Sequence, residues 1–253
     1  MLVLAAILLT FSNASANEIY ITQAGDNLDL TIDQKGSNNQ IKGLPSGNAS
    51  ISGNDNTVEL NQGYEGNNLI EMSIDGANND VTVNQERGFG GYDTDSYGNH
   101  YAGVEIDGSG NSVEITQRNN SGSSAGHHGS VRFRGSNNTA DILQTGTGGS
   151  NGHLTSIYTH DTESNNTVDV FQNSDTADHK AYVSLYADGN TVDINQTGAT
   201  QNRAYVIFFN NSAGPTDFTL NRNGGDTYGN PDTGSYATVS CGSPAGCTVN
   251  VSQ

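Results

Sequence analysis

The sequence predicts an all-β protein, a two-sheet β-solenoid of about nine stacked strand-turn-strand repeats with loop insertions. A string of the form Asn-x-apolar-x-apolar-x-Gln recurs along the chain, and its Gln residues lie 23 to 32 residues apart, a period typical of solenoids. Apolar and polar residues alternate within each string, which indicates β-strands. Clusters of Gly, Asn and Asp precede the strings, as expected of tight turns.

The first sixteen residues have a composition of their own. An apolar run from Leu2 to Phe11 leads into Ala14-Ser15-Ala16, a small-x-small pattern typical of signal-peptide cleavage. We therefore expect residues 1–16 to be a signal peptide and residues 17–253 to be exported. The run is too short to span a bilayer, so we expect no membrane insertion.

The strand of each string places its Asn, its two apolar residues and its Gln on one face, because side chains alternate along a strand. The best repeats cover residues 49–196, and degenerate repeats cover residues 19–34 and 204–253. We expect the amides of the best repeats to line the interior in two columns: Asn56, Asn79, Asn111, Asn138, Asn166 and Asn190, and Gln62, Gln85, Gln117, Gln144, Gln172 and Gln196.

A leading strand is expected before most of the strings, with an inward apolar pair in each. The pairs are Ala49 and Ile51, Met72 and Ile74, Val104 and Ile106, Val131 and Phe133, and Val183 and Leu185. One repeat offers too few aliphatic side chains to bury its own face, so the repeats must stack, about 4.8 Å apart within each sheet and with about 10 Å between sheets. In such a stack each amide can hydrogen-bond to the same amide of the next repeat.

Two segments near the start add a family resemblance. Ile21-Thr22-Gln23-Ala24-Gly25-Asp26-Asn27 and Ile32-Asp33-Gln34-Lys35-Gly36-Ser37-Asn38, together with the repeated Asn-x5-Gln, resemble the curlin repeat of curli subunits, Ser-x5-Gln-x4-Asn-x5-Gln. The resemblance implies a secreted fibre subunit or nucleator, extracellular or on the surface of a Gram-negative bacterium. Such a protein stacks into amyloid-type fibres for biofilm and adhesion. Its implied partners are further copies of the chain and other curli-type subunits.

The charge balance excludes some partners. The chain has 27 Asp and Glu against 9 Lys and Arg, a formal net charge of -18, so we expect no binding to nucleic acid or to anionic membranes. Outward positions form an acidic column of Glu59, Glu114, Asp141, Asp169 and Asp193, and a column of Thr57, Ser112, Thr139, Thr167, Thr191 and Thr248. We interpret this face as solvated and as a guard against aggregation; calcium binding by the carboxylates and ice binding by the threonines are the alternatives.

No motif for catalysis or for cofactor binding is present, so we expect no enzyme activity, no catalytic residues, no metal ligands and no cofactor. Six histidines fall in loops or at loop edges without fixed spacing, and we interpret them as solubilising residues: His100, His127, His128, His153, His160 and His179. The alternatives to a fibre subunit are a monomeric surface adhesin of the same fold and a β-helix protein that binds or cleaves sugars.

The two cysteines, Cys241 and Cys247, flank a short Gly- and Pro-containing turn in the last repeat. Because an exported chain enters an oxidising compartment, we predict that they form a disulfide that pins the final rung.

Overall fold

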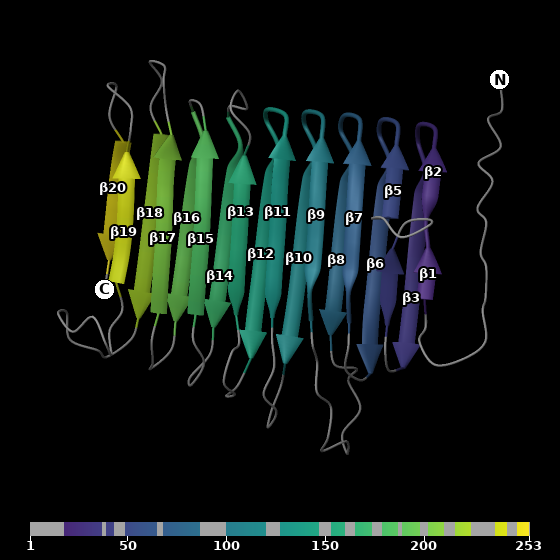
Figure 1. Ribbon diagram of the computed structural model, residues 1–253, viewed down its shortest axis with the longest axis horizontal. Coiled ribbons are helices and arrows are strands. Elements are labelled where there is room, and N and C mark those ends of the chain that lie inside the picture. The colour runs from purple at the N-terminus through teal and green to yellow at the C-terminus, as the bar shows by residue number, and fades with distance from the viewer. Residues whose placement is uncertain are drawn as a thin grey trace.

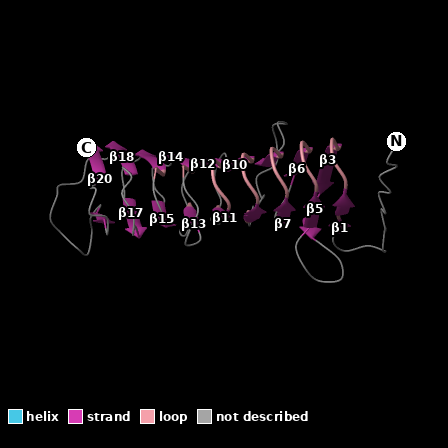
Figure 2. Ribbon diagram, turned by 90° about the horizontal axis from the view of Figure 1, so that it is seen from above, coloured by secondary structure: helices cyan, strands magenta, loops and turns pink. Residues whose placement is uncertain are grey.

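The protein is a β-solenoid of two parallel sheets that face each other (Figures 1 and 2). The computed structural model describes residues 18–36, 39–42, 49–64, 68–86, 100–119, 127–146, 153–159, 165–173, 179–186, 189–197, 202–209, 216–223, 236–241 and 247–252. The strands at the two ends of the chain lie at opposite ends of the stack, β1 to β3 at one end and β19 and β20 at the other. The predicted fold class, an all-β solenoid of two stacked sheets, is confirmed.

The leading strands form an 11-stranded sheet, here called sheet A. Its strands are β1 (Glu18–Tyr20), β2 (Thr22–Ala24), β4 (Gln40–Lys42), β5 (Ala49–Ser52), β7 (Ile70–Asp75), β9 (Ala102–Asp107), β11 (His128–Arg134), β13 (Leu154–Thr159), β15 (His179–Tyr186), β17 (Asn202–Phe209) and β19 (Tyr236–Cys241). The order is β1-β4-β7-β9-β11-β13-β15-β17-β19, with β5 pairing with both β2 and β7.

The Asn-x5-Gln strings form a nine-stranded sheet, sheet B, in the order β20-β18-β16-β14-β12-β10-β8-β6-β3. Its strands are β3 (Asp29–Gly36), β6 (Thr57–Tyr64), β8 (Asp80–Glu86), β10 (Ser112–Asn119), β12 (Thr139–Gly146), β14 (Thr167–Asn173), β16 (Thr191–Thr197), β18 (Thr216–Asn223) and β20 (Cys247–Ser252). Equivalent residues of the strings pair in register, as Gln85 with Gln117 and Gln117 with Gln144. Each repeat is therefore one rung with a strand in each sheet.

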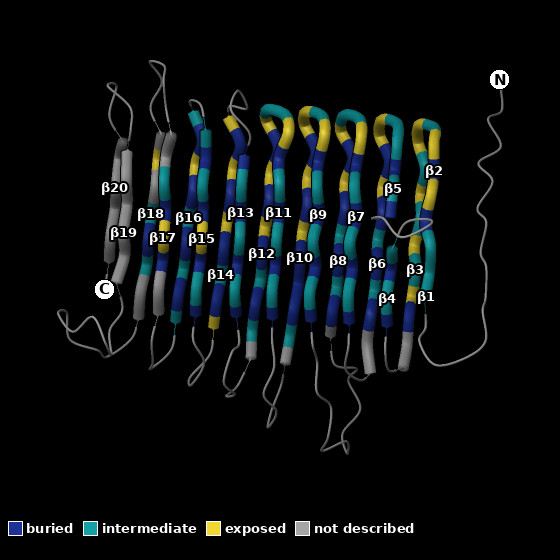
Figure 3. Tube along the Cα trace, in the orientation of Figure 1, coloured by how far each residue is buried: buried dark blue, intermediate teal, exposed yellow. Residues whose placement is uncertain are grey.

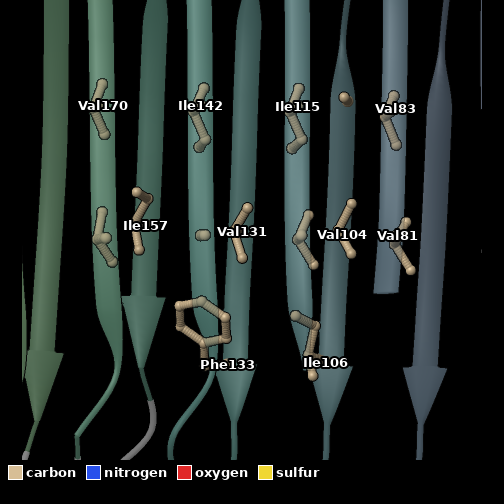
Figure 4. Packing of buried hydrophobic residues seen from close by; sticks show 14 of the residues in the cluster. Val81, Val83, Val104, Ile106, Ile115, Val131, Phe133, Ile142, Ile157 and Val170 are labelled. Atoms are coloured by element: carbon tan, nitrogen blue, oxygen red, sulfur yellow. The ribbon is translucent and has the colours of Figure 1, made fainter. Parts of the chain in front are cut away.

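The core consists of medium-sized apolar side chains from both sheets (Figure 4), and buried and more exposed positions alternate along the strands (Figure 3). Inward and outward positions alternate along each strand, so β7 shows buried Ile70, Met72 and Ile74 between more exposed residues. In one rung the largest core residue, Phe133, occurs together with the small Ala140, where the preceding rung has Ile106 and Val113. This exchange of a large for a small residue keeps the filled volume similar from rung to rung.

The turn between the two strands of a rung stacks on the turn of the next rung. A glycine opens the turn with a positive φ, as at Gly53 (132°) and Gly76 (143°), a conformation that L side chains rarely adopt. A Cβ on Gly76 would also collide with the main-chain carbonyl of Gly53 in the adjacent rung. Two residues later comes a left-handed residue, for example Asn78 (φ 56°) or Gly110 (φ 74°). Close stacking of the main chain therefore requires glycine at the first of these positions.

One leading strand, β13, does not follow the apolar pattern of the others. β13 has the inward residues Thr155, Ile157 and Thr159, of which only one is aliphatic, and no apolar pair marks it in the sequence. The Thr155 hydroxyl donates to Gln144 Oε1 at 3.0 Å. A polar residue can lie at this inward position because the amide column beside it supplies the hydrogen-bond partner.

Candidate functional site: polar columns inside the solenoid

A column of glutamines runs along the interior at the ends of the sheet B strands. Each side-chain nitrogen donates to the side-chain oxygen of the preceding rung, as from Gln117 to Gln85 (2.8 Å) and from Gln144 to Gln117 (3.0 Å). The other links are Gln62 to Gln34, Gln85 to Gln62, Gln172 to Gln144 and Gln196 to Gln172, at 2.8 to 3.0 Å. The column is an unbroken amide ladder from β3 to β16.

The same glutamines also join the two sheets. Gln85 Nε2 donates to the main-chain carbonyl of Tyr101 (3.0 Å), Gln144 Nε2 to that of Leu154 (3.1 Å) and Gln172 Nε2 to that of Lys180 (2.9 Å). Each acceptor lies at the start of the next leading strand. Both N–H groups of these amides are therefore used, one along the stack and one across it, so that each Gln closes the corner between successive rungs.

A column of asparagines lies at the opposite ends of the same strands. The main-chain N–H and the side-chain Nδ2 of one Asn both donate to the Oδ1 of the next, as from Asn79 to Asn111 (2.9 and 3.0 Å). Asn56 donates to Asn79 and Asn111 to Asn138 in the same way. The Asn bonds point toward the C-terminal rungs and the Gln bonds toward the N-terminal rungs. The solenoid thus has an internal polarity, with two ladders of opposite direction.

All twelve amides expected inside are buried, with at most 1% of each residue exposed: Asn56, Asn79, Asn111, Asn138, Asn166 and Asn190, and Gln62, Gln85, Gln117, Gln144, Gln172 and Gln196. The structure separates them by type into the two columns. Gln34 continues the Gln ladder at the first rung, whereas Leu28 occupies the Asn position there and uses its main-chain N–H to bond Asn56 Oδ1 (2.9 Å).

Four histidines form a third polar column inside the solenoid, which the sequence analysis did not predict. His100, His127, His153 and His179 are at most 6% exposed, and they stack with ring centroids 5.0, 4.5 and 4.9 Å apart. The interpretation of these four residues as solubilising loop residues was therefore wrong. Each precedes the first inward residue of a leading strand by two positions, so strand alternation turns it inward. Buried Asn39 and Asn68 occupy the same register position in earlier rungs. His128 is a half-buried outward neighbour, and His160 lies outside the described residues.

Burial makes protonation of this His column unfavourable. It lowers the pKa of His100 to about 4, and burial together with the charges of His179 and His100 lowers the pKa of His153 to about 3. Burial and neighbouring histidines also hold the pKa of His127 well below its ordinary value. At neutral pH the rings of His100, His127 and His153 are therefore uncharged and stack within the interior. Successive ring planes are inclined by 27°, 3° and 12°, so all three neighbouring pairs are stacked.

The acidic column lies on the outer face of sheet B. Glu114, Asp141, Asp169 and Asp193 occupy the same register position in four successive rungs. Partial burial raises the pKa of Asp141, Asp169 and Asp193, and neighbouring carboxylates add to this for Asp141 and Asp193. Thr82 interrupts the column between Glu59 and Glu114. Among the residues described, no group of three or more His, Cys, Asp or Glu side chains is arranged to hold a metal ion.

Two predictions fall outside the described part of the chain. Residues 1–16 are one of them. The other is the disulfide, because the side chains of Cys241 and Cys247 are not described; Cys241 ends β19 and Cys247 begins β20, the last strands of the two sheets. The described residues include no helix that could cross a membrane. Comparisons with protein-family models, curated proteins and solved structures found no match.

Proposed function

We propose that the protein is an exported, curlin-like fibre subunit or nucleator that stacks end to end through the open edges of its two sheets. Four strands support this directly. Within the described residues, β1 pairs only with β4, β3 only with β6, β19 only with β17 and β20 only with β18. An unpaired strand presents a row of main-chain donors and acceptors that can template another strand.

The direction of stacking follows from the polarity of the molecule. All strand pairs within each sheet are parallel, so a second copy continues the same pairing only when its N-terminal rung meets the C-terminal rung of the first. Head-to-head contact would oppose the direction of the strands and of both amide ladders. We therefore expect polar fibres that grow by head-to-tail addition of whole solenoids.

The N-terminal edge offers a specific test. The carbonyl of Leu28 accepts from the Thr57 N–H (2.7 Å), so with a period of two the main-chain groups of Leu30 and Ile32 face β6. Those of Thr31 and Asp33 point to the open edge. The Thr31 side chain is exposed. A Thr31→Pro variant thus removes an edge donor without removing a bond inside the monomer.

We expect purified wild-type protein to form thioflavin-positive fibres in the electron microscope, and Thr31→Pro to slow their elongation strongly. Thr31→Val keeps the N–H and is the matched control. Fibres that grow equally fast from both variants would refute stacking through this edge. A wild-type chain that stays monomeric at all concentrations would favour the alternative of a monomeric surface adhesin.

A further inference from the structure

The two outer faces of the solenoid differ in charge over the same rungs. Strands β11, β13, β15 and β17 of sheet A contain four basic residues and no Asp or Glu. Strands β12, β14, β16 and β18 of sheet B, which belong to these rungs, contain four acidic residues, three of them in one column (Asp141, Asp169 and Asp193), and a single base, Arg222 in β18. In a chain of net charge -18, this separation creates one donor-rich face and one acceptor-rich face.

The donor-rich face, called the basic face here, consists of the outward side chains Arg132, Arg134, Lys180, Tyr158, Tyr182 and Tyr205. Arg132 and Arg134 share one carboxylate, Glu105 in β9, at 3.7 and 2.7 Å, and Asp107 of β9 is the register partner of Arg134. Both guanidinium side chains remain about 40% exposed. Arg132 also lies 5.5 Å from the centre of the Tyr158 ring, which fixes its position on the sheet.

The aromatic residues add contact area to this face. Tyr182 and Tyr205 are 44% and 37% exposed, the largest exposed apolar side chains of the described residues, and their ring centroids lie 6.1 Å apart. Each tyrosine hydroxyl can donate a hydrogen bond to a carboxylate, as can the arginine and lysine groups beside it. The face therefore fits a flat, acidic, oxygen-rich partner.

We propose that this partner is a second copy of the chain, docked sideways so that its acidic column of Glu114, Asp141, Asp169 and Asp193 covers the basic face. Charge complementarity supports the choice, because the chain itself carries a flat column of carboxylates, of which Asp141, Asp169 and Asp193 lie on the rungs of the basic face. Both surfaces are sheets with the same strand spacing of about 4.8 Å, so contacts can repeat along the stack. The contact is heterologous and leaves one face of each copy open, so stacks would join side by side into layers.

The test uses two charge-reversed versions of the full chain. One carries Arg132→Glu and Lys180→Glu on the basic face, and the other carries Asp141→Lys and Asp169→Lys on the acidic column. Each variant alone has lost the net charge of one of the two faces, whereas an equal mixture brings the unchanged acidic column of the first variant together with the unchanged basic face of the second. Glu71→Lys with Asp75→Lys, on the N-terminal part of sheet A, raises the net charge by the same amount as the acidic-column variant and is its control. Circular dichroism checks that every variant is folded.

Side-by-side association is measured by sedimentation of unassembled chains and by fibre width in electron micrographs, with thioflavin elongation followed separately. We expect the sideways association of each reversed variant alone to be at least about tenfold weaker than that of the wild type. The equal mixture should recover wild-type association, and the control variant should match the wild type. Wild-type chains that do not associate sideways, a mixture that does not recover, or a control that fails equally would overturn the proposal. So would Lys180-dependent binding of polygalacturonate without self-association, which would assign the face to an anionic polysaccharide.

The sedimentation result does not depend on fibre growth. If no fibres form, sideways association of single solenoids still tests the basic face. If fibres form but are only one solenoid wide, end-to-end stacking is supported and the sideways contact is refuted.

Discussion

Acidification should destabilise the solenoid at its His column before the carboxylates titrate. Four imidazole rings stack at 4.5 to 5.0 Å in a buried column, and the pKa values of His100 and His153 fall to about 4 and about 3. In the unfolded chain a histidine titrates near 6.5. Between these values the unfolded state binds more protons than the folded state, so stability is complete above about pH 6.5 and falls as the pH drops.

The size of the loss follows from the two pKa values. At pH 5 each of these two histidines costs about 2 kcal/mol relative to neutral pH, because the unfolded form is almost fully protonated and the folded form is not. Together they remove about 4 kcal/mol, a large part of the 5 to 15 kcal/mol typical of a folded domain. The raised pKa values of Asp141, Asp169 and Asp193 act in the opposite direction, adding stability as the pH falls through them.

Urea unfolding at pH 7 and pH 5, followed by circular dichroism, measures this loss. The variant His127→Asn/His153→Asn places in the column the residue type that Asn39 and Asn68 supply in earlier rungs. We expect it to lose at least about 2 kcal/mol less than the wild type between the two pH values. His128→Asn, at the half-buried outward neighbour, is the control. Equal stability of the wild type at both pH values, or an equal loss in the column variant, would refute the reasoning.

Four further predictions concern the other columns and the last rung. Gln144→Ala leaves neighbouring amides of the ladder without partners, so it should destabilise the monomer by about 1 to 3 kcal/mol and slow fibre growth. The change His128→Ala should do neither, and equal fibre lag times for the two variants would argue against the ladder. Gly76→Ala places a Cβ at a residue of positive φ and against the Gly53 carbonyl, so it should lower the free energy of unfolding by more than about 2 kcal/mol. Asn78→Gly, at a left-handed position, should change the urea midpoint little. A small effect of Gly76→Ala would mean that the turns do not stack closely. Raising the salt concentration or adding calcium should shorten the lag of fibre growth by screening the acidic column. The variant Asp141→Asn/Asp169→Asn should reduce that salt dependence. A lag that neither salt nor calcium changes would show that the column does not oppose growth. Mass spectrometry of unreduced protein should find Cys241 joined to Cys247, and two alkylatable thiols would contradict the predicted disulfide.

Most strands of sheet B were predictable because one signal recurs in six of them, β6, β8, β10, β12, β14 and β16. Asn, two apolar residues and Gln alternate at a period of two, and that period alone fixes which side chains point inward. The leading strands with apolar pairs, such as Val104 and Ile106, follow the same rule. β13 does not, because its inward Thr155 is satisfied by Gln144 rather than by apolar neighbours, and hydrophobic periodicity cannot detect a polar residue that only tertiary contact makes acceptable.

The His column could have been found from its position. His100, His127, His153 and His179 recur 26 to 27 residues apart, and each stands two residues before the first inward position of a leading strand. Histidine has no strong preference for the interior, so its type gave no signal, and the segments of irregular length before it suggested a loop. The bond from each Gln to the opposite sheet could not be predicted either, because it depends on how the corner brings the two strands together.

The most direct test of end-to-end stacking is the axial repeat of the fibre, measured by electron cryomicroscopy. If whole solenoids add head to tail with unbroken sheets, strands lie perpendicular to the fibre axis at about 4.8 Å. The subunit repeat is then about 43 Å, the rise of the nine strands of sheet B. Strands that run along the axis, or a subunit repeat far from this length, would contradict stacking through the open sheet edges.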